Sequence, residues 1–120
     1  LDTAQAMAYL HACTPQIIHR DLKSLNALLT TPVLCESDKP LVKIADFGLS
    51  RMKDQAPDSD WGKMTNAAGT CHWMAPEVFT GTRYDAKVDV YSYAMILFEV
   101  LCREIPFEDV EPASIGRLLV

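Results

Sequence analysis

The sequence predicts an α+β fold that is mostly α-helical, in which short strands surround a polar loop and one helix lies buried at the centre. Apolar residues recur at helical spacing over residues 1–13 and 86–102, which predicts two helices. Three apolar runs have the length of short strands; they are residues 16–19, 27–30 and 41–45. With 120 residues, of which 49% are hydrophobic, the chain can form one domain with its own core.

Proline residues set several of the predicted boundaries. The first helix is expected to end before Pro15, because the residue that precedes a proline is disfavoured in helical geometry. Pro76 suits the first turn of a short helix that ends near Phe79, and a further helix begins at Pro112. Residues 31–40 contain two prolines and several charged side chains, so we expect an exposed connection there.

The helix predicted over residues 86–102 is apolar nearly all round, which is typical of a helix that is buried on every side. Asp85 can cap its N-terminus. Asp89 lies in its first turn, where an unpaired buried carboxylate would be costly. We therefore expect Asp89 to accept hydrogen bonds from backbone amides of the polar loop at residues 19–26.

Composition and charge exclude several classes of function. The net charge of -5 and the lack of a run of Lys and Arg argue against binding to nucleic acid or an anionic membrane. The uncharged run Val90–Phe98 is much shorter than the ~20 residues that span a bilayer. The four cysteines include no Cys-x-x-Cys pair, so no zinc site is predicted, and reduced thiols fit a cytoplasmic or nuclear protein. His11 lies on the first helical pattern and is interpreted as a packing residue.

The polar loop, hereafter the 19–26 loop, is His19-Arg20-Asp21-Leu22-Lys23-Ser24-Leu25-Asn26. Its side chains suit phosphoryl transfer. Asp21 could orient a substrate hydroxyl and accept its proton, Lys23 could neutralise the moving phosphoryl group, and Asn26 could hold a metal ion. An isolated Asp-x-Lys pair is most often a solvated surface pair. The fixed spacing of so many suitable residues favours a catalytic loop instead.

A second motif, Asp46-Phe47-Gly48, follows the strand predicted over residues 41–45. Asp46 offers a carboxylate for a metal ion, Gly48 permits unusual backbone angles, and Phe47 could turn its ring between core and solvent. Residues 50–69 show little apolar periodicity, and a long loop that follows a metal ligand is predicted to be a mobile gate.

The two motifs are followed along the chain by Ala75-Pro76-Glu77 and Asp89-Val90-Tyr91-Ser92. In this order they resemble the signature motifs of eukaryotic protein kinases. Over essentially its whole length, the chain is similar to the C-terminal lobe of a kinase catalytic domain, and this resemblance implies the fold of that lobe.

Finer details of the resemblance point to a subgroup. Lys23, together with Gly69-Thr70, resembles the serine/threonine kinases. Trp73-Met74 and the Tyr91-Ser92-Tyr93 segment resemble the tyrosine-kinase-like group, which includes mixed-lineage and Raf-type enzymes. The implied activity is ATP-dependent phosphorylation of serine and threonine hydroxyls on protein substrates.

The resemblance also implies ATP and Mg²⁺ as cofactors. Asp21 would be the catalytic base, and Asn26 and Asp46 would hold magnesium. Lys23 would bridge to the transferred phosphate, and Thr70 would contact the side chains of Asp21 and Lys23.

Three further positions match structural parts of the family. Leu28 matches the residue that lies under the adenine ring. His19 and Phe47 match two members of a hydrophobic stack that Asp89 anchors.

Several parts of a kinase have no counterpart in residues 1–120, among them the glycine-rich loop, the strand lysine with its helix glutamate, and the hinge. The resemblance therefore implies a partial kinase domain that lacks the N-terminal lobe and the C-terminal end, and we expect the chain alone to be inactive. Its partners would be ATP, a protein substrate and an upstream activating kinase. The alternative is a non-catalytic pseudokinase, or a truncated module that binds kinases.

A phosphorylation switch is expected in the predicted gate. Family likeness places Arg51 near Arg20, and two guanidinium groups could pair with one phosphate. Thr65 is the best candidate to carry that phosphate, ahead of Ser59 and Ser50. The simpler alternative is that Thr65 is only an exposed polar residue.

Overall fold

The structure is a computed structural model that describes residues 1–52, 71–81 and 83–120, with residues 51 and 52 described by their backbone alone. In chain order, its helices and strands are α1 (Asp2–Ala12), β1 (Ile17–Ile18), β2 (Ala27–Leu29), β3 (Val42–Ile44), β4 (Arg51–Met52), α2 (Pro76–Phe79), α3 (Lys87–Cys102) and α4 (Pro112–Leu119). Two short 3-10 helices, η1 (Ser24–Asn26) and η3 (Cys71–Trp73), lie between them. The described part is thus α+β and mostly helical, which confirms the predicted class.

The described strands form two separate antiparallel pairs. β2 pairs with β3, with Ala27 opposite Ile44 and Leu29 opposite Val42. β1 pairs with β4, a strand that the sequence did not predict. The 19–26 loop therefore runs from one strand pair to the other, since β1 precedes it and β2 follows it. The predicted strands all form, each shorter than its apolar run.

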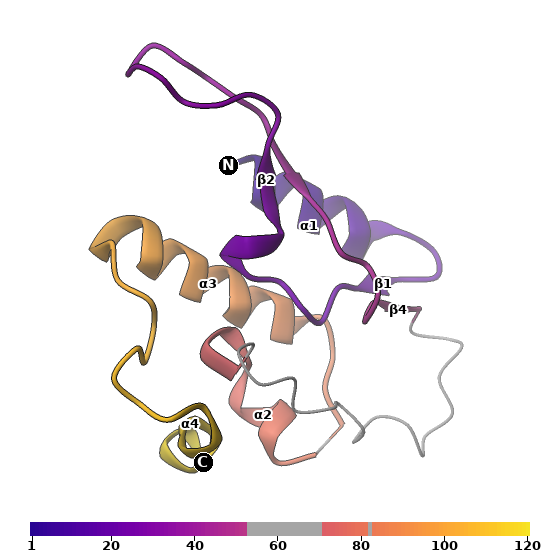
Figure 1. The fold of residues 1–120 in the computed structure, drawn as a ribbon. Coiled ribbons are helices and arrows are strands. Elements are labelled where there is room, and N and C mark those ends of the chain that lie inside the picture. The colour runs from indigo at the N-terminus through magenta and orange to yellow at the C-terminus, as the bar shows by residue number, and fades with distance from the viewer. Residues whose placement is uncertain (53–70, 82) are drawn as a thin grey trace.

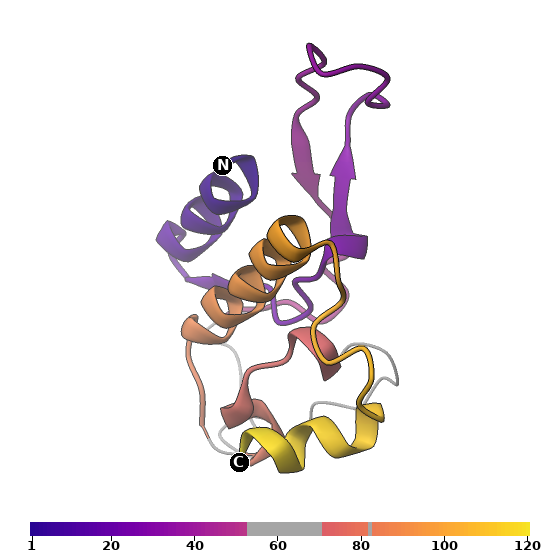
Figure 2. The same ribbon diagram turned by 90° about the vertical axis from the view of Figure 1, so that its left-hand side faces the viewer.

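The connection between β2 and β3 extends away from the helices (Figures 1 and 2). Its side chains are mostly exposed, which confirms the connection predicted over residues 31–40. Within it, Oδ2 of Asp38 accepts hydrogen bonds from the backbone N–H groups of Leu34 and Cys35, at 2.7 and 2.9 Å. These hydrogen bonds stabilise the charged form and lower the pKa of Asp38.

α3 runs through the middle of the described structure, with α1 on one side and α2 and α4 on the other (Figures 1 and 2). One core cluster, formed by Met7, Leu22, Trp73 and Ile96, joins α1 and the 19–26 loop to α3 and η3. A second cluster joins β1 to the segment around α2 and the start of α3. Its buried members are Ile18, Ala75, Tyr84 and Val88. Full burial of an Ile, Leu, Met or Val side chain in these clusters contributes about 1.5–3 kcal/mol.

The expected burial of α3 on every side is wrong for one of its faces. The buried residues lie on one face, and they are Val88, Asp89, Ser92 and Ile96. The opposite face is apolar but exposed; the exposed fractions are 53% for Val90, 41% for Leu97, 40% for Phe98 and 80% for Leu101. Apolar side chains favour burial, but they are buried only where another element packs on them. No described element covers this face of α3.

The N-terminus of α3 also differs slightly from the expectation. The helix begins at Lys87, with Ala86 in the cap position. Asp85 lies one residue earlier, and its Oδ1 accepts a hydrogen bond from the backbone N–H of Lys87 at 2.8 Å. Farther along α3, burial and the nearby carboxylate of Glu77 raise the pKa of Tyr91, in that order of importance.

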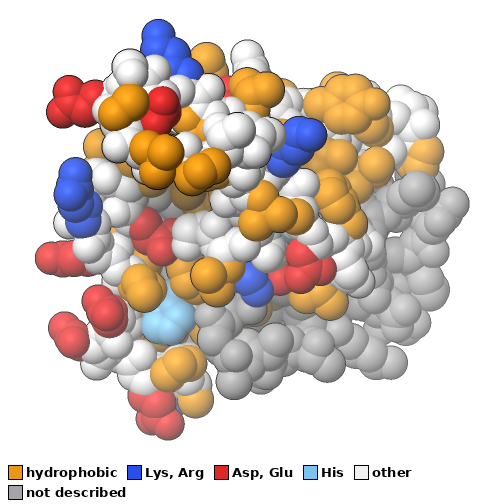
Figure 3. All heavy atoms as spheres, turned by 45° about the horizontal axis from the view of Figure 1, so that its top comes forward, with side chains coloured by type: hydrophobic (Ala, Val, Ile, Leu, Met, Phe, Trp, Pro, Cys, Tyr) orange, Lys and Arg blue, Asp and Glu red, His pale blue; other side chains and the backbone are white. Residues whose placement is uncertain are grey.

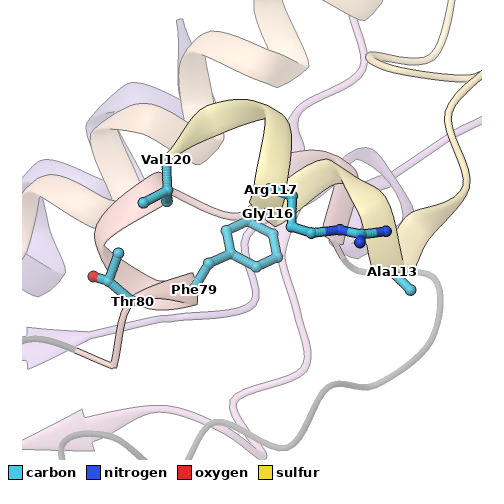
Figure 4. Close-up of a pocket in the computed structure, with 6 residues that line it drawn as sticks. All are labelled: Phe79, Thr80, Ala113, Gly116, Arg117 and Val120. Atoms are coloured by element: carbon cyan, nitrogen blue, oxygen red, sulfur yellow. The ribbon is translucent and has the colours of Figure 1, made fainter.

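α2 packs against α4 through Phe79 and Gly116. A Cβ atom at position 116 would lie 2.6 Å from Cδ1 of Phe79, so the ring packs directly on a backbone that has no side chain. The two helices also line a cavity of about 650 Å³, where Arg117 is the one charged side chain among the lining residues (Figure 4).

The described surface mixes hydrophobic and charged side chains. On the face shown in Figure 3, hydrophobic groups reach the surface between scattered charges of both signs. Within the described ranges, none of the helices combines the length and the hydropathy that a membrane crossing requires.

Candidate active site

Asp89 holds the start of the 19–26 loop from the buried face of α3. Its Oδ2 accepts a hydrogen bond from the backbone N–H of His19 at 2.9 Å, and its Oδ1 accepts one from that of Arg20 at 2.8 Å. The residue is only 1% exposed. The prediction that a buried Asp89 binds amides of this loop is confirmed, and these hydrogen bonds offset the cost of burying a charge.

Arg20 has an unusual backbone conformation. Its φ angle is 70°, in the left-handed region that a residue with a side chain rarely adopts. Such a conformation costs of order 1–3 kcal/mol and persists only where the surrounding structure enforces it. The hydrogen bond from the amide of Arg20 to Asp89 helps to enforce it, and Asp21 is the next residue along the chain.

The side chains of Asp21, Lys23 and Asn26 meet within the loop, as their predicted roles require. Oδ2 of Asp21 accepts hydrogen bonds from Nζ of Lys23 at 2.9 Å and from Nδ2 of Asn26 at 3.3 Å. Nδ2 of Asn26 also donates to the backbone carbonyl of Asp21 at 2.7 Å. The other carboxylate oxygen of Asp21, Oδ1, is buried and has no hydrogen-bond partner among the described residues. That oxygen thus keeps its capacity to accept a further hydrogen bond.

His19 connects Asp21 to the end of β3. Its Nδ1 accepts a hydrogen bond from the backbone N–H of Asp21 at 3.3 Å, and its Nε2 lies 3.1 Å from the carbonyl oxygen of Ala45. Both contacts are satisfied by the neutral tautomer that carries its hydrogen on Nε2. The ring centroids of His19 and Phe47 are 5.1 Å apart. The predicted contact between these two rings is present, and His19 is completely buried.

The pairing between β2 and β3 places Asp46 directly after Ala45, whose backbone bonds to that of Asn26. The backbone N–H of Ala45 donates to the carbonyl of Asn26 at 2.9 Å. Asn26 directly precedes β2 and Ala45 directly follows β3, so the two residues are neighbours at this end of the strand pair. Asp46 is exposed. Nδ2 of Asn26 is already bonded to Asp21, which leaves its Oδ1 as the atom that could bind a cation.

The unusual backbone angle in the second motif belongs to Asp46 and not to Gly48, where the sequence suggested it. The φ angle of Asp46 is 64°. Aspartate tolerates this region because its short side chain can bond to nearby backbone, and here Oδ1 of Asp46 accepts a hydrogen bond from the N–H of Gly48 at 3.3 Å. At position 48, glycine is favoured for lack of space, because a Cβ atom there would lie only 3.2 Å from Oδ1 of Asp46.

Asn26 and Asp46 offer an amide oxygen and a carboxylate, which are ligands of the kind that Mg²⁺ prefers. Within the described ranges, no group of three or more His, Cys, Asp or Glu side chains could hold a metal ion. Asn26 and Asp46 together would supply two protein ligands to such a cation. Mg²⁺ accepts this arrangement because it keeps several waters and binds phosphate oxygens as well.

Glu99, which the sequence analysis missed, bridges two segments of the site. Its Oε1 accepts a hydrogen bond from Oγ of Ser24 at 2.9 Å, and its Oε2 accepts one from Nε1 of Trp73 at 2.8 Å. Ser24 belongs to the 19–26 loop, and Trp73 belongs to η3. The signal that revealed Asp89, a carboxylate within an apolar helix, was equally present at Glu99.

The interpretation of His11 as a packing residue is wrong. Nε2 of His11 lies 2.7 Å from Oδ2 of Asp89, within hydrogen-bond and ion-pair distance. The two residues are far apart in sequence, and a helical pattern in α1 contains no information about a partner on α3. The side chain of His11 is 19% exposed, so it lies at the edge of the core.

The remaining predicted site residues are less well defined. Leu28 is 53% exposed on β2, where it lies opposite Lys43. Arg20 is buried, whereas Arg51 is described by its backbone alone. Oγ of Ser50 donates to the carbonyl of His19 at 3.4 Å. Three predicted residues lie outside the described residues, as does most of the predicted gate; they are Thr70, Thr65 and Ser59.

The chain is similar to known protein kinases over nearly its whole length. The chain is 50% identical over 115 residues to the serine/threonine-protein kinase TNNI3K of Mus musculus, a match that covers 95% of this chain and 13% of that protein. It is 48% identical over 117 residues to the serine/threonine-protein kinase VIK of Arabidopsis thaliana, which covers 98% of this chain and 26% of that protein.

A third relative is the dual specificity protein kinase splA of Dictyostelium discoideum, which is 45% identical over 125 residues; the match covers 98% of this chain and 5% of that protein. The chain thus spans between 5% and 26% of the length of these three relatives. The family model described as the protein kinase domain matches residues 1–118. Because that match includes nearly all of its 120 residues, the chain belongs to the protein kinase domain family.

Proposed function

We propose that the whole protein that contains this chain transfers the γ-phosphate of ATP to serine or threonine hydroxyls of protein substrates. The observation that carries the proposal is the buried carboxylate of Asp21, which uses one oxygen to hold Lys23 and Asn26 and keeps the other without a partner among the described residues. We further propose that residues 1–120 belong to the C-terminal lobe of the catalytic domain.

In this mechanism, Oδ1 of Asp21 accepts a hydrogen bond from the substrate hydroxyl and orients its oxygen toward the γ-phosphorus. A bond forms between that oxygen and the phosphorus, and the bond from the phosphorus to the β,γ-bridging oxygen breaks. The hydroxyl proton passes to Asp21, and ADP leaves. Lys23 lies 2.9 Å from Oδ2 of Asp21, so its positive charge is close to the phosphoryl group during transfer.

Two further residues would bind the cofactors. Asn26 and Asp46 would hold magnesium, which when bound neutralises part of the charge of the phosphates. The exposed side chain of Leu28 on β2 would lie against the adenine ring. The rest of the nucleotide site would come from parts of the protein outside residues 1–120, so we expect this chain alone to bind ATP weakly and to lack activity.

The decisive test replaces the proposed base in the intact protein. Asp21→Asn should lower the rate of phosphate transfer by about a hundredfold or more, because a positioned general base contributes a factor of this size. Binding of ATP should remain, since Asp21 is not a proposed nucleotide ligand. Asp38→Asn is the matched control, because Asp38 lies in the exposed β2–β3 connection, and it should leave the rate unchanged. Near-normal turnover of Asp21→Asn with a radiolabelled phosphate would refute the assignment.

The same assay should include peptides that present serine, threonine or tyrosine. One relative is named a dual specificity kinase, so transfer to tyrosine as well is the second candidate activity. If the wild-type protein transfers phosphate to none of them, a non-catalytic module that binds kinases becomes the better explanation.

A further inference from the structure

We propose that Asp2 is a positioning residue for the magnesium site: it holds the open edge of β3, the strand that leads into Asp46. The inference rests on the proposed function, in which Asn26 and Asp46 would hold the ion. It adds to that proposal a side chain at the start of α1. In this role, Asp2 contacts neither the metal ion nor the nucleotide.

Asp2 reaches β3 across a long separation in sequence. Its Oδ2 accepts a hydrogen bond from the backbone N–H of Val42 at 2.9 Å. Asp2 is the first residue of α1, a helix whose N-terminal cap forms no side-chain hydrogen bond. The hydrogen bond of the Asp2 carboxylate thus goes to a strand and not to its own helix, and α1 contacts β3 as a whole.

The N–H of Val42 points away from β2. In an antiparallel pair, the backbone groups of alternate residues face the partner strand. The carbonyl of Leu41 and the N–H of Ala45 both bond to the residues that flank β2, so Val42 is one of the intervening residues whose N–H faces outward. Among the described strands, only β2 pairs with β3. Asp2 therefore supplies the acceptor that this edge of β3 lacks.

β3 needs support from outside its strand pair. It is three residues long, as is β2, and an isolated pair of strands is at best marginally stable in water. Val42 is the first residue of β3 and follows the exposed connection of residues 31–40 closely. Asp2 thus holds the strand at the end where the exposed connection enters it.

β3 transmits this restraint to Asp46. Asp2 holds one end of the strand at Val42, and at the other end the N–H of Ala45 bonds to the carbonyl of Asn26 at 2.9 Å. Asp46 comes next, with a φ angle of 64°. Such a backbone conformation persists only where the surrounding structure enforces it. Release of the Val42 amide would loosen β3, and Asp46 would then be held less firmly relative to Asn26.

The test compares Asp2→Ala with Asp2→Asn in the intact protein. Both variants remove the negative charge from the start of α1, but the amide oxygen of Asn can still accept the hydrogen bond of Val42, whereas Ala has no acceptor. At a fixed ATP concentration, we expect the Mg²⁺ concentration for half-maximal rate to rise by about fivefold in Asp2→Ala and by less than about twofold in Asp2→Asn. The first effect is smaller than the roughly 10–100-fold loss caused by removing a direct partner of a metal ligand. The kcat at saturating Mg²⁺ should stay within about twofold of the wild type in both.

Hydrogen exchange provides a readout without activity or metal. The amide of Val42 should exchange about tenfold faster in Asp2→Ala than in the wild type, and Asp2→Asn should keep most of the protection. Titration of ATP with and without Mg²⁺ measures the site independently of phosphate transfer. A wild type that transfers no phosphate but binds ATP in a Mg²⁺-dependent way would refute the proposed function alone. Binding of ATP that does not depend on Mg²⁺ would overturn the inference as well.

Two results in the variants would also overturn the proposal. If the Mg²⁺ requirement rises equally in Asp2→Ala and Asp2→Asn, the charge at the start of α1 matters and the hydrogen bond does not. If the Mg²⁺ requirement of Asp2→Ala is unchanged, even at a lower Tm, Asp2 serves folding and not the placement of Asp46. A higher Mg²⁺ requirement in Asp2→Ala with faster exchange of the Val42 amide, and recovery of both in Asp2→Asn, is the result that we expect.

Discussion

The two faces of α3 both carry large apolar residues but differ in what surrounds them. One face buries Val88 and Ile96 together with the polar residues Asp89 and Ser92. The opposite face carries apolar residues that remain exposed, such as Leu101 at 80%. Only the first face supports the candidate active site. What distinguishes it in the sequence is the presence of polar residues within the apolar pattern, and each of these has a specific hydrogen-bond partner.

Ser92 illustrates this point together with Asp89. Oγ of Ser92 lies 2.7 Å from the carbonyl oxygen of Trp73 and 3.0 Å from that of Val88. Asp89 binds the start of the 19–26 loop. The buried face of α3 thus holds both the 19–26 loop and η3, which are separated by more than forty residues in the sequence.

The largest effect is expected from Asp89→Ala on the buried face. The change leaves two buried backbone N–H groups and the ring of His11 without an acceptor, and each such loss costs about 1–3 kcal/mol. We expect the free energy of unfolding of the intact kinase domain to fall by about 4 kcal/mol in urea denaturation, with loss of activity. The matched control is Asp85→Ala, which removes one exposed contact to Lys87 and should cost about 1 kcal/mol or less. Equal losses in the two variants would contradict the special role of Asp89.

Removing apolar volume from the buried face should have the next largest effect. Ile96 is 7% exposed and packs with Met7, Leu22 and Trp73. We expect Ile96→Ala to lower the free energy of unfolding by about 3 kcal/mol, and Ile96→Val by about 1 kcal/mol, because the cost grows with the cavity that is left. Denaturation of both variants provides the measurement. A loss below 1 kcal/mol for Ile96→Ala would show that the core around the 19–26 loop is loosely packed.

Much of this fold could be predicted because its elements are short and locally encoded. α1 ends before Pro15, α2 begins at Pro76, and the strands flank the 19–26 loop as their apolar runs suggest. The partner of Asp89 was also predictable, since a buried carboxylate requires donors and the loop is rich in free amides.

The rest depends on contacts between segments that are distant in sequence. β4 is only two residues long, too short to produce a pattern, and it forms by pairing with β1. The partners of His11 and Glu99 lie on other elements, so no spacing along the chain reveals them. Hydropathy predicted that α3 would be buried, but it contains no information about whether each face has a partner.

A smaller effect should reveal the bridge through Glu99. The double-mutant cycle compares Ser24→Ala, Trp73→Phe and the double variant, which remove the two hydrogen bonds to one carboxylate and leave the carboxylate in place. We expect a coupling free energy of about 1 kcal/mol in denaturation of the intact domain, because both donors fix the same side chain. In a background of Glu99→Gln, the coupling should fall by about half or more, since an amide has only one oxygen that accepts hydrogen bonds. Additive losses in the first cycle would show that Ser24 and Trp73 act independently.

The smallest effect on stability is expected on the exposed face of α3. Replacing Leu97 and Leu101 with Gln keeps a helix-forming side chain of similar length, and in the 120-residue chain it should change the free energy of unfolding by less than about 1 kcal/mol. The change should nevertheless reduce association of this chain, measured by light scattering, because contiguous exposed apolar groups favour contacts between molecules. Tyr9→Gln and Leu118→Gln are the controls, since these residues are 73% and 65% exposed on other helices. If the α3 variant destabilises the chain as much as Ile96→Ala does, this face is packed, and the two faces of α3 do not differ as described.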